Sequence, residues 1–186
     1  MQRRAFLGLA LLGLGACATQ PRQQLAGTVP DGLDGPYRLD SGDKLRVTVF
    51  EQTALSGTFS IDQAGYIAFP LVGNVPVRGL TTQEVAGAIT RALKKGYLTK
   101  PDVTVEVDTY RPFFIMGEVR NPGQYTYVNA MTIETAVAIA GGFTSRANER
   151  RIEVSRRLNG KIFEGALPPS ALVRPGEVLK VAQRLF

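Results

Sequence analysis

The chain has no histidine, no tryptophan and a single cysteine among its 186 residues. Histidine is the commonest general base and metal ligand in proteins, and tryptophan offers the largest ring for stacking on sugars. Hydrolysis by two carboxylates is therefore the one enzymatic route left to consider. A single cysteine also leaves no second thiol for a disulfide. We expect no cofactor, no metal site and no catalytic residue.

Three carboxylates are candidates for the acid and the base of glycoside hydrolysis, namely Asp43, Asp62 and Glu118. Each belongs to a glycine-containing turn, where acidic side chains are favoured because they accept hydrogen bonds from the backbone. We interpret all three as turn residues, and we expect the protein not to be an enzyme.

The N-terminus has the pattern of an export signal. Arg3 and Arg4 precede an apolar stretch that runs to Ala16 and is interrupted only by glycines. This stretch is too short to span a bilayer as a mature anchor, and it predicts a signal peptide over residues 1–16. The two arginines with the following Phe-Leu pair also resemble the twin-arginine signal, so the choice between that route and the general secretory route stays open.

The cysteine follows this signal in the sequence Leu14-Gly15-Ala16-Cys17, which resembles the lipobox of bacterial lipoproteins. The motif needs small residues before the cysteine because a peptidase must reach that bond after the thiol is acylated. We expect Cys17 to be lipidated and to become the mature N-terminus, the alternative being a free or buried thiol. Ala18 stands where an aspartate would resemble an inner-membrane retention signal, so we expect anchoring to the periplasmic face of the outer membrane.

The formal net charge of +6 is modest and spread along the chain. Nucleic acid is not an expected partner outside the cytoplasm, whereas an anionic polymer or lipid surface remains possible. The densest basic run has two interpretations that the sequence leaves open. It attracts an acidic exopolysaccharide or an inner-membrane partner, or it is a solvated loop and strand edge. Its members are Arg146, Arg150, Arg151, Arg156 and Arg157.

Residues 17–36 are rich in Gln, Gly, Pro and Thr without an apolar period, which predicts a tether. A first domain is expected over residues 37–110. Apolar alternation predicts strands over residues 45–49 and 103–107 and an extended piece over 66–73. Thr81 and Glu84 form a capping-box pattern at the start of a helix that should run to Leu93, with a glycine cap at Gly96.

A second domain is expected over residues 111–186. Its predicted elements are a strand over 113–116, a strand carrying Tyr125 and Tyr127, a helix over about 132–140, a hairpin with Asn159-Gly160 at its tip, and a last strand over 178–181. The lead-in Pro175-Gly176-Glu177 echoes Ser41-Gly42-Asp43. We interpret the echo as shared turn chemistry and not as duplication.

Seven aromatic residues could form a sugar-stacking surface, but aromatics at alternating strand positions more often belong to a core or an interface. We expect core or interface for most of them. They are Tyr66, Phe69, Tyr110, Phe113, Phe114, Tyr125 and Tyr127.

Many short motifs in the first half, in the same order, resemble the polysaccharide export domain of Wza-type outer-membrane export lipoproteins. They are Tyr37-Arg38-Leu39, Gly42-Asp43-Lys44-Leu45-Arg46-Val47, Asp62 to Gly65, Phe69-Pro70-Leu71-Val72-Gly73 and Gly79-Leu80-Thr81. The second half resembles the soluble-ligand-binding β-grasp domain (SLBB) of the same family. Its motifs are Gly117-Glu118-Val119, Asn121-Pro122-Gly123, Ile133-Glu134, Ala140-Gly141-Gly142-Phe143 and Pro175-Gly176-Glu177.

The resemblance implies an α+β fold, in which a polysaccharide export domain with a small sheet and one helix is followed by a β-grasp domain. It also implies a homo-oligomeric periplasmic ring in a capsule or exopolysaccharide export channel, through which polysaccharide passes in transit without any bond being made. The expected partner is an inner-membrane polysaccharide copolymerase or tyrosine-kinase-type complex.

Larger members of the family carry a further β-grasp repeat and a C-terminal amphipathic helix. The present chain stops directly after its last strand, so we expect a separate outer-membrane pore protein as a further partner. The alternative function is that of a periplasmic ligand-sensing or adhesive β-grasp lipoprotein. The sequence does not identify the polysaccharide or the number of subunits in a ring.

Overall fold

The computed structural model describes residues 36–158 and 161–184. The predicted signal peptide, Arg3, Arg4, Cys17 and the hairpin tip Asn159-Gly160 lie outside the described residues, and what was expected of them stays a prediction.

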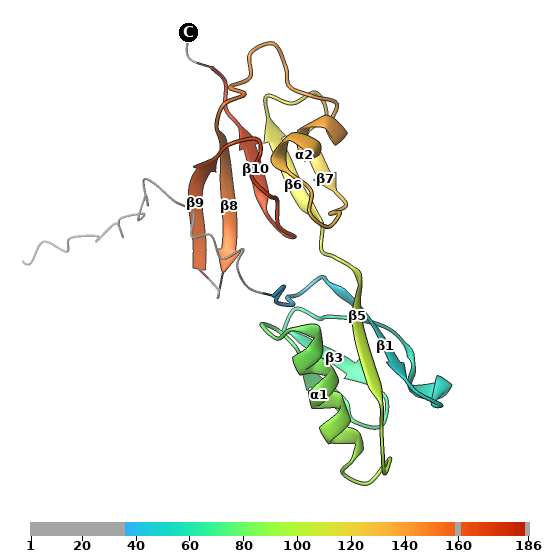
Figure 1. The fold of residues 1–186 in the computed structure, drawn as a ribbon. Helices are drawn as coiled ribbons and strands as arrows, with labels where there is room; N and C mark the ends of the chain where they lie inside the picture. The colour runs from blue at the N-terminus through green and yellow to red at the C-terminus, as the bar shows by residue number, and fades with distance from the viewer. Residues whose placement is uncertain (1–35, 159–160, 185–186) are drawn as a thin grey trace, which may run out of the picture.

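A three-stranded antiparallel sheet organises the first half of the described chain (Figure 1). Its central strand, β1 (Lys44–Val49), pairs with β2 (Gly57–Ser60) on one side and with β5 (Val103–Thr109) on the other. Successive residues of a strand face opposite sides, and every second residue of β1 is buried in the core. A short 3-10 helix, η1 (Thr53–Leu55), connects β1 to β2. The strands predicted at 45–49 and 103–107 are confirmed.

The piece predicted as a single extended segment over residues 66–73 is a hairpin, and the prediction was wrong on this point. Strands β3 (Tyr66–Phe69) and β4 (Gly73–Pro76) pair antiparallel in a sheet of their own. The chain reverses because Leu71 and Gly73 adopt positive φ angles of 66° and 82°. A leucine in that region gives little sequence signal, since non-glycine residues rarely adopt it.

Helix α1 (Thr82–Leu93) begins with the predicted capping box. The backbone N–H of Glu84 donates to Oγ1 of Thr81 at 3.2 Å, and the backbone N–H of Thr81 donates to the Glu84 carboxylate at 2.7 Å. Its buried face packs on the first sheet. The helix reaches its C-cap at Lys94, so Gly96, with a φ of 123°, follows two residues beyond that cap.

The second half contains five strands and helix α2 (Ile133–Ile139). The strands are β6 (Phe113–Gly117), β7 (Gly123–Tyr125), β8 (Ile152–Leu158), β9 (Lys161–Leu167) and β10 (Val178–Val181). They form one mixed sheet in the order β7-β6-β10-β8-β9, with α2 packed on its core face. Strands β6 and β10 pair in parallel, and the other pairs are antiparallel. The strand predicted to carry both Tyr125 and Tyr127 ends at Tyr125, so the prediction was wrong for Tyr127.

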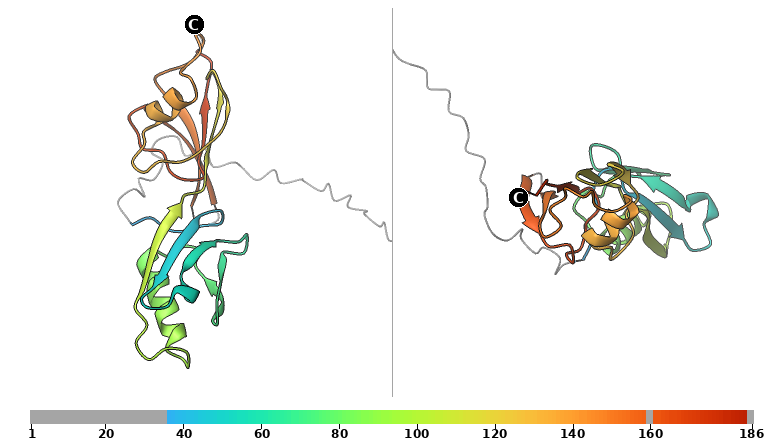
Figure 2. Two further views of the ribbon diagram at one scale, coloured as in Figure 1. Left: turned by 90° about the vertical axis from the view of Figure 1, so that its right-hand side faces the viewer. Right: turned by 90° about the horizontal axis from the view of Figure 1, so that it is seen from above.

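The buried apolar side chains of the described residues form two separate hydrophobic clusters. One contains the buried side chains of the first two sheets and α1, and the other contains those of the five-stranded sheet and α2. Figures 1 and 2 show two bodies joined end to end through residues 110–112. The α+β fold expected from the sequence is confirmed. Among the described residues, no helix combines the length and apolar character needed to span a membrane.

Candidate functional site at the junction of the two halves

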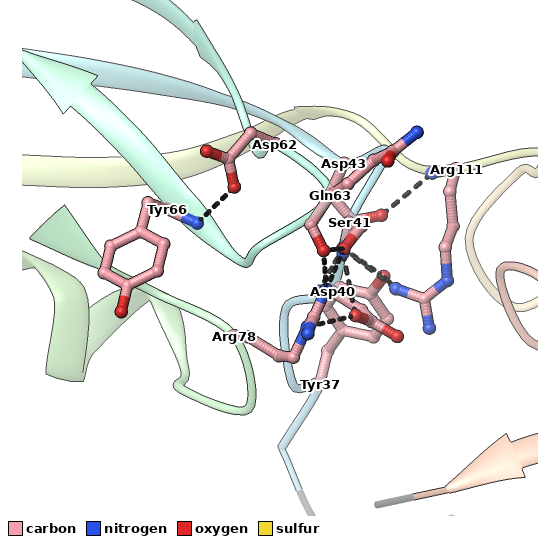
Figure 3. Close-up of polar contacts among 9 residues, drawn as sticks. All are labelled: Tyr37, Asp40, Ser41, Asp43, Asp62, Gln63, Tyr66, Arg78 and Arg111. Atoms are coloured by element: carbon pink, nitrogen blue, oxygen red, sulfur yellow. Dashed lines mark hydrogen bonds and ion pairs between the residues drawn. The ribbon is translucent and has the colours of Figure 1, made fainter. Parts of the chain in front are cut away.

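Asp43 is the centre of a polar cluster where the two halves meet (Figure 3). The tight turn at Gly42, whose φ is 92°, places Asp43 at the entry to β1 with 0% of its surface exposed. Its carboxylate accepts hydrogen bonds from the Tyr37 hydroxyl at 2.7 Å and from the backbone N–H of Asp40 at 3.0 Å. It also accepts two from Arg111, at 2.9 Å from the backbone N–H and at 3.1 Å from Nη1.

Three of these hydrogen bonds converge on Oδ2, and Oδ1 accepts the fourth, from the backbone N–H of Arg111. A buried carboxylate that accepts from three separate places along the chain fits a structural role, because buried polar groups need partners. Burial, and next the neighbouring Asp43 carboxylate, raise the pKa of the Tyr37 phenol above its ordinary value. Tyr37 therefore remains a hydrogen-bond donor to Asp43, and the cluster is built to hold parts of the chain together.

A second set of contacts surrounds Arg78 and ties three turns of the first half together. Nε of Arg78 donates to Asp40 at 3.0 Å, and Nη2 donates to the Ser41 hydroxyl and to the carbonyl of Gln63. The motif that ends in Gly65 needs its glycine here, because a Cβ at that position would come within 2.6 Å of Cβ of Arg78. The motifs that begin at Tyr37, Gly42 and Asp62 thus converge on one network.

Aromatic rings continue this network into the second half. Tyr110 makes edge contacts with Tyr37 at 5.0 Å and with Tyr127 at 5.3 Å between ring centroids. Of the other aromatic candidates, Phe69 and Phe113 are buried in the two cores, and Tyr125 stacks on Phe113 at 5.9 Å. Core or packed positions are therefore confirmed for most of the seven. The two with large exposed fractions are Tyr66 at 38% and Phe114 at 41%.

Glu177 repeats the local geometry of Asp43 in front of the last strand. Each acid follows a glycine with positive φ, and each accepts a hydrogen bond at 3.0 Å from the backbone N–H three residues earlier. Each also binds an arginine, Arg111 for Asp43 and Arg156 for Glu177. Burial raises the pKa of the Glu177 carboxyl, and the Arg156 guanidinium opposes that shift. The two lead-ins therefore share their turn chemistry, as the sequence echo predicts, and whether they arose by duplication is a separate question that this geometry does not test.

The basic run divides into two parts. Arg156, only 2% exposed, is buried in its ion pair with Glu177, so neither interpretation of the run applies to it. It faces the core because it shares a face of β8 with the buried Ile152 and Val154. The remaining members, Arg146, Arg150, Arg151 and Arg157, are exposed.

The other two candidate carboxylates also have structural partners. Asp62 accepts a hydrogen bond from the backbone N–H of Tyr66 at 2.8 Å, within its own turn. Glu118 accepts one from the Thr144 hydroxyl and one from Arg146 at 3.3 Å. Across residues 36–158 and 161–184, no group of three or more acidic or cysteine side chains is placed to hold a metal ion. The sequence reasoning missed Tyr37, Arg78 and Arg111 as partners, because long-range ion pairs leave no local pattern.

Comparison with known families matches both halves of the chain. Residues 32–108 match the family described as polysaccharide biosynthesis/export protein, and residues 112–164 match the SLBB domain. The chain belongs to the polysaccharide export family. This is a polysaccharide export family, and it is non-enzymatic.

Curated relatives have names that refer to the production, export or transport of a polysaccharide. The chain is 39% identical to the exopolysaccharide production protein ExoF of Rhizobium meliloti in an alignment 127 positions long that covers 62% of the chain and 30% of ExoF. It is 31% identical to the EPS I polysaccharide export outer membrane protein EpsA of Ralstonia solanacearum in an alignment 183 positions long that covers 80% of the chain and 48% of EpsA. It is 28% identical to the polysialic acid transport protein KpsD of Escherichia coli in an alignment 113 positions long that covers 60% of the chain and 20% of KpsD. The chain spans less than half the length of these relatives.

Proposed function

We propose that this protein is a periplasmic ring subunit of a capsule or exopolysaccharide export channel. The observation that carries the proposal is the order of the two domains, export domain then SLBB domain, together with relatives whose names describe polysaccharide export or transport. The polymer passes in transit through a cavity enclosed by identical subunits, and the protein makes and breaks no bond.

The domain organisation that we propose is the one predicted from the sequence. Residues 1–16 form the signal peptide, residues 17–36 form a tether lipidated at Cys17, and the two domains occupy residues 37–110 and 111–186. The lipid would hold the protein to the periplasmic face of the outer membrane, and one relative is named as an outer membrane protein. Mass spectrometry of the mature protein tests this point, with Cys17→Ser as the control. An unacylated N-terminus at any other residue contradicts it.

Subunit contacts need surfaces that one copy offers to the next. The face of the five-stranded sheet opposite α2 carries exposed apolar side chains, with Phe114 41%, Met116 44% and Ile162 62% exposed. Strands β2, β5, β7 and β9 are edges of their sheets. Exposed edges and apolar faces favour association, and a head-to-tail contact whose rotation closes produces a ring.

A ring of two-domain subunits also needs the domains to keep one orientation. The Asp43–Arg111 ion pair and the Tyr37–Tyr110–Tyr127 contacts join the two halves at the linker itself. This junction supports the proposal because subunits with a fixed interdomain angle can repeat around an axis without strain.

The proposed partners are those that the family implies, an inner-membrane polysaccharide copolymerase or tyrosine-kinase-type complex and a separate outer-membrane pore protein. Ring assembly is tested by chemical cross-linking of the anchored protein in cells that make the polymer. A ladder that ends at one closed size supports the proposal. Monomer alone under conditions that cross-link a known periplasmic oligomer contradicts it.

A further inference from the structure

The C-terminal segment lies at the end of the second half that is remote from α1 (Figure 1). Together with the loop that precedes β8, this segment lines a basic groove. The groove is open to solvent and has a volume of about 780 Å³ between the loop that precedes β8 and the residues that follow β10. Three arginines, two amides and one carboxylate line it, namely Arg146, Arg150, Arg184, Asn148, Gln183 and Glu149.

The backbone holds the two walls of this basic groove together. Ala147 and Gln183 form an antiparallel bridge. The backbone N–H of Arg184 donates to the carbonyl of Arg146 at 2.8 Å, and that of Asn148 donates to the carbonyl of Ala182 at 2.8 Å. The side chain of Ala147 is buried beneath the loop. The backbone of both walls is therefore in place before any ligand binds, so that binding does not pay the entropic cost of ordering this loop.

The arginines of the groove differ in how they are engaged. Arg146 contacts Glu118 at 3.3 Å, although its side chain is 68% exposed. Arg150 and Arg184 are exposed, and within residues 36–158 and 161–184 neither of them forms an ion pair. With one carboxylate against three guanidinium groups, the lining has a surplus of positive charge. Two guanidinium groups are thus available to a ligand.

We propose that this groove binds carboxylate-bearing sugar residues of an acidic polysaccharide. A guanidinium group donates two parallel hydrogen bonds to a carboxylate, a geometry that lysine does not offer. The amides of Asn148 and Gln183 can donate to and accept from sugar hydroxyls. A polymer with alternating carboxylate and hydroxyl groups matches this mixture better than a purely anionic surface does. The inference rests on the proposed export function and adds to it a substrate class and a contact site.

The probe for this inference is oligogalacturonate, with neutral dextran as its counterpart. The full chain should bind oligogalacturonate and not dextran, and the affinity should fall as salt is added, because exposed charges are screened. The double variant Arg150→Glu/Arg184→Glu should bind about tenfold more weakly or worse, which corresponds to the loss of one good charged contact.

The matched control is Lys95→Glu/Lys100→Glu, which makes the same change in charge at two exposed positions after α1. It should retain most of the binding, and circular dichroism should show both double variants folded. Equal loss in the two variants, or no binding by the wild type, overturns the inference. Tighter binding to anionic phospholipid vesicles or to polyglutamate than to oligogalacturonate also overturns it and reassigns the groove to a membrane or a protein. Failure here with export intact leaves the proposed function standing.

Discussion

Arg111 donates to the Asp43 carboxylate both from its backbone N–H, at 2.9 Å, and from its guanidinium group, at 3.1 Å. Its side chain also lies against two glycine turns, one from each half. A Cβ on Gly42 would lie 3.4 Å from Cβ of Arg111, and a Cβ on Gly176 would lie 2.5 Å from Nε. The residue that begins the second half is therefore enclosed by the turn before β1 and by the turn before β10.

Replacing Asp43 with alanine should destabilise the protein strongly. The change leaves a largely buried guanidinium group, a phenol and two backbone N–H groups without their acceptor. Breaking a buried ion pair by removing one partner costs about 3–5 kcal/mol. Urea unfolding measures the free energy of unfolding, with Asp62→Ala at an exposed turn as the control. Similar losses in the two variants would show that the junction contributes little.

Gly176→Ala should cost more stability than Gly79→Ala. Both glycines have positive φ, at 80° and 76°, and such a conformation costs an alanine about 1–3 kcal/mol. Only at Gly176 does the new Cβ collide with Arg111, since nothing lies within 4 Å of a Cβ on Gly79. The difference should disappear in an Arg111→Ala background. A difference that persists there would mean that Arg111 is not confined by this turn.

Tyr37 should make the stability of the protein fall at alkaline pH. Its folded pKa is raised above the ordinary phenol value of about 10, so the folded state holds the proton at pH values where the unfolded state has lost it. The contribution of protonated Tyr37 to the free energy of unfolding is complete below about pH 10 and decreases as the pH rises further. The stability advantage of the wild type over Tyr37→Phe should therefore shrink above pH 10. Denaturant midpoints measured on both proteins check this, with Tyr97→Phe at an exposed tyrosine as the control, and a constant advantage would contradict it.

The outer face of the five-stranded sheet provides a test of assembly. Phe114→Asp should shorten the cross-linked ladder if this face meets the neighbouring subunit, because the carboxylate would be buried without a partner. Ile139→Asp is the matched control, since Ile139 is 49% exposed on α2, across the sheet from Phe114, which is 41% exposed. Both variants must give the far-ultraviolet spectrum of the wild type. A ladder unchanged by Phe114→Asp would remove this face from the interface.

The features that the sequence predicts well are those set by neighbours along the chain. Alternating apolar and polar residues predicted β1 and β5, and the Thr81–Glu84 capping box predicted the start of α1. Each of these patterns depends only on residues within one strand or one turn. The positive φ of Leu71 was not predictable, since the surrounding fold imposes it against the preference of leucine.

The candidate site was predicted only in part, for the same reason. Asp43 and the Gly176-Glu177 lead-in were recognisable from turn chemistry. Their arginines were not, because Arg111 lies 68 residues from Asp43, and Arg156 lies 21 residues from Glu177. Arg156 also belonged to a run of arginines that suggested solvent exposure. Its side chain faces the core because of the register of β8 in the sheet, which the sequence alone does not reveal.

The most direct test of the export function is deletion of the gene in the organism that carries it, followed by separate measurement of polysaccharide at the cell surface and inside the cell envelope. A conduit subunit predicts that surface polymer disappears while polymer or its lipid-linked precursors persist inside, and that the wild-type gene restores export. Normal capsule or exopolysaccharide at the surface, in a strain without a second copy of the gene, would contradict the proposal.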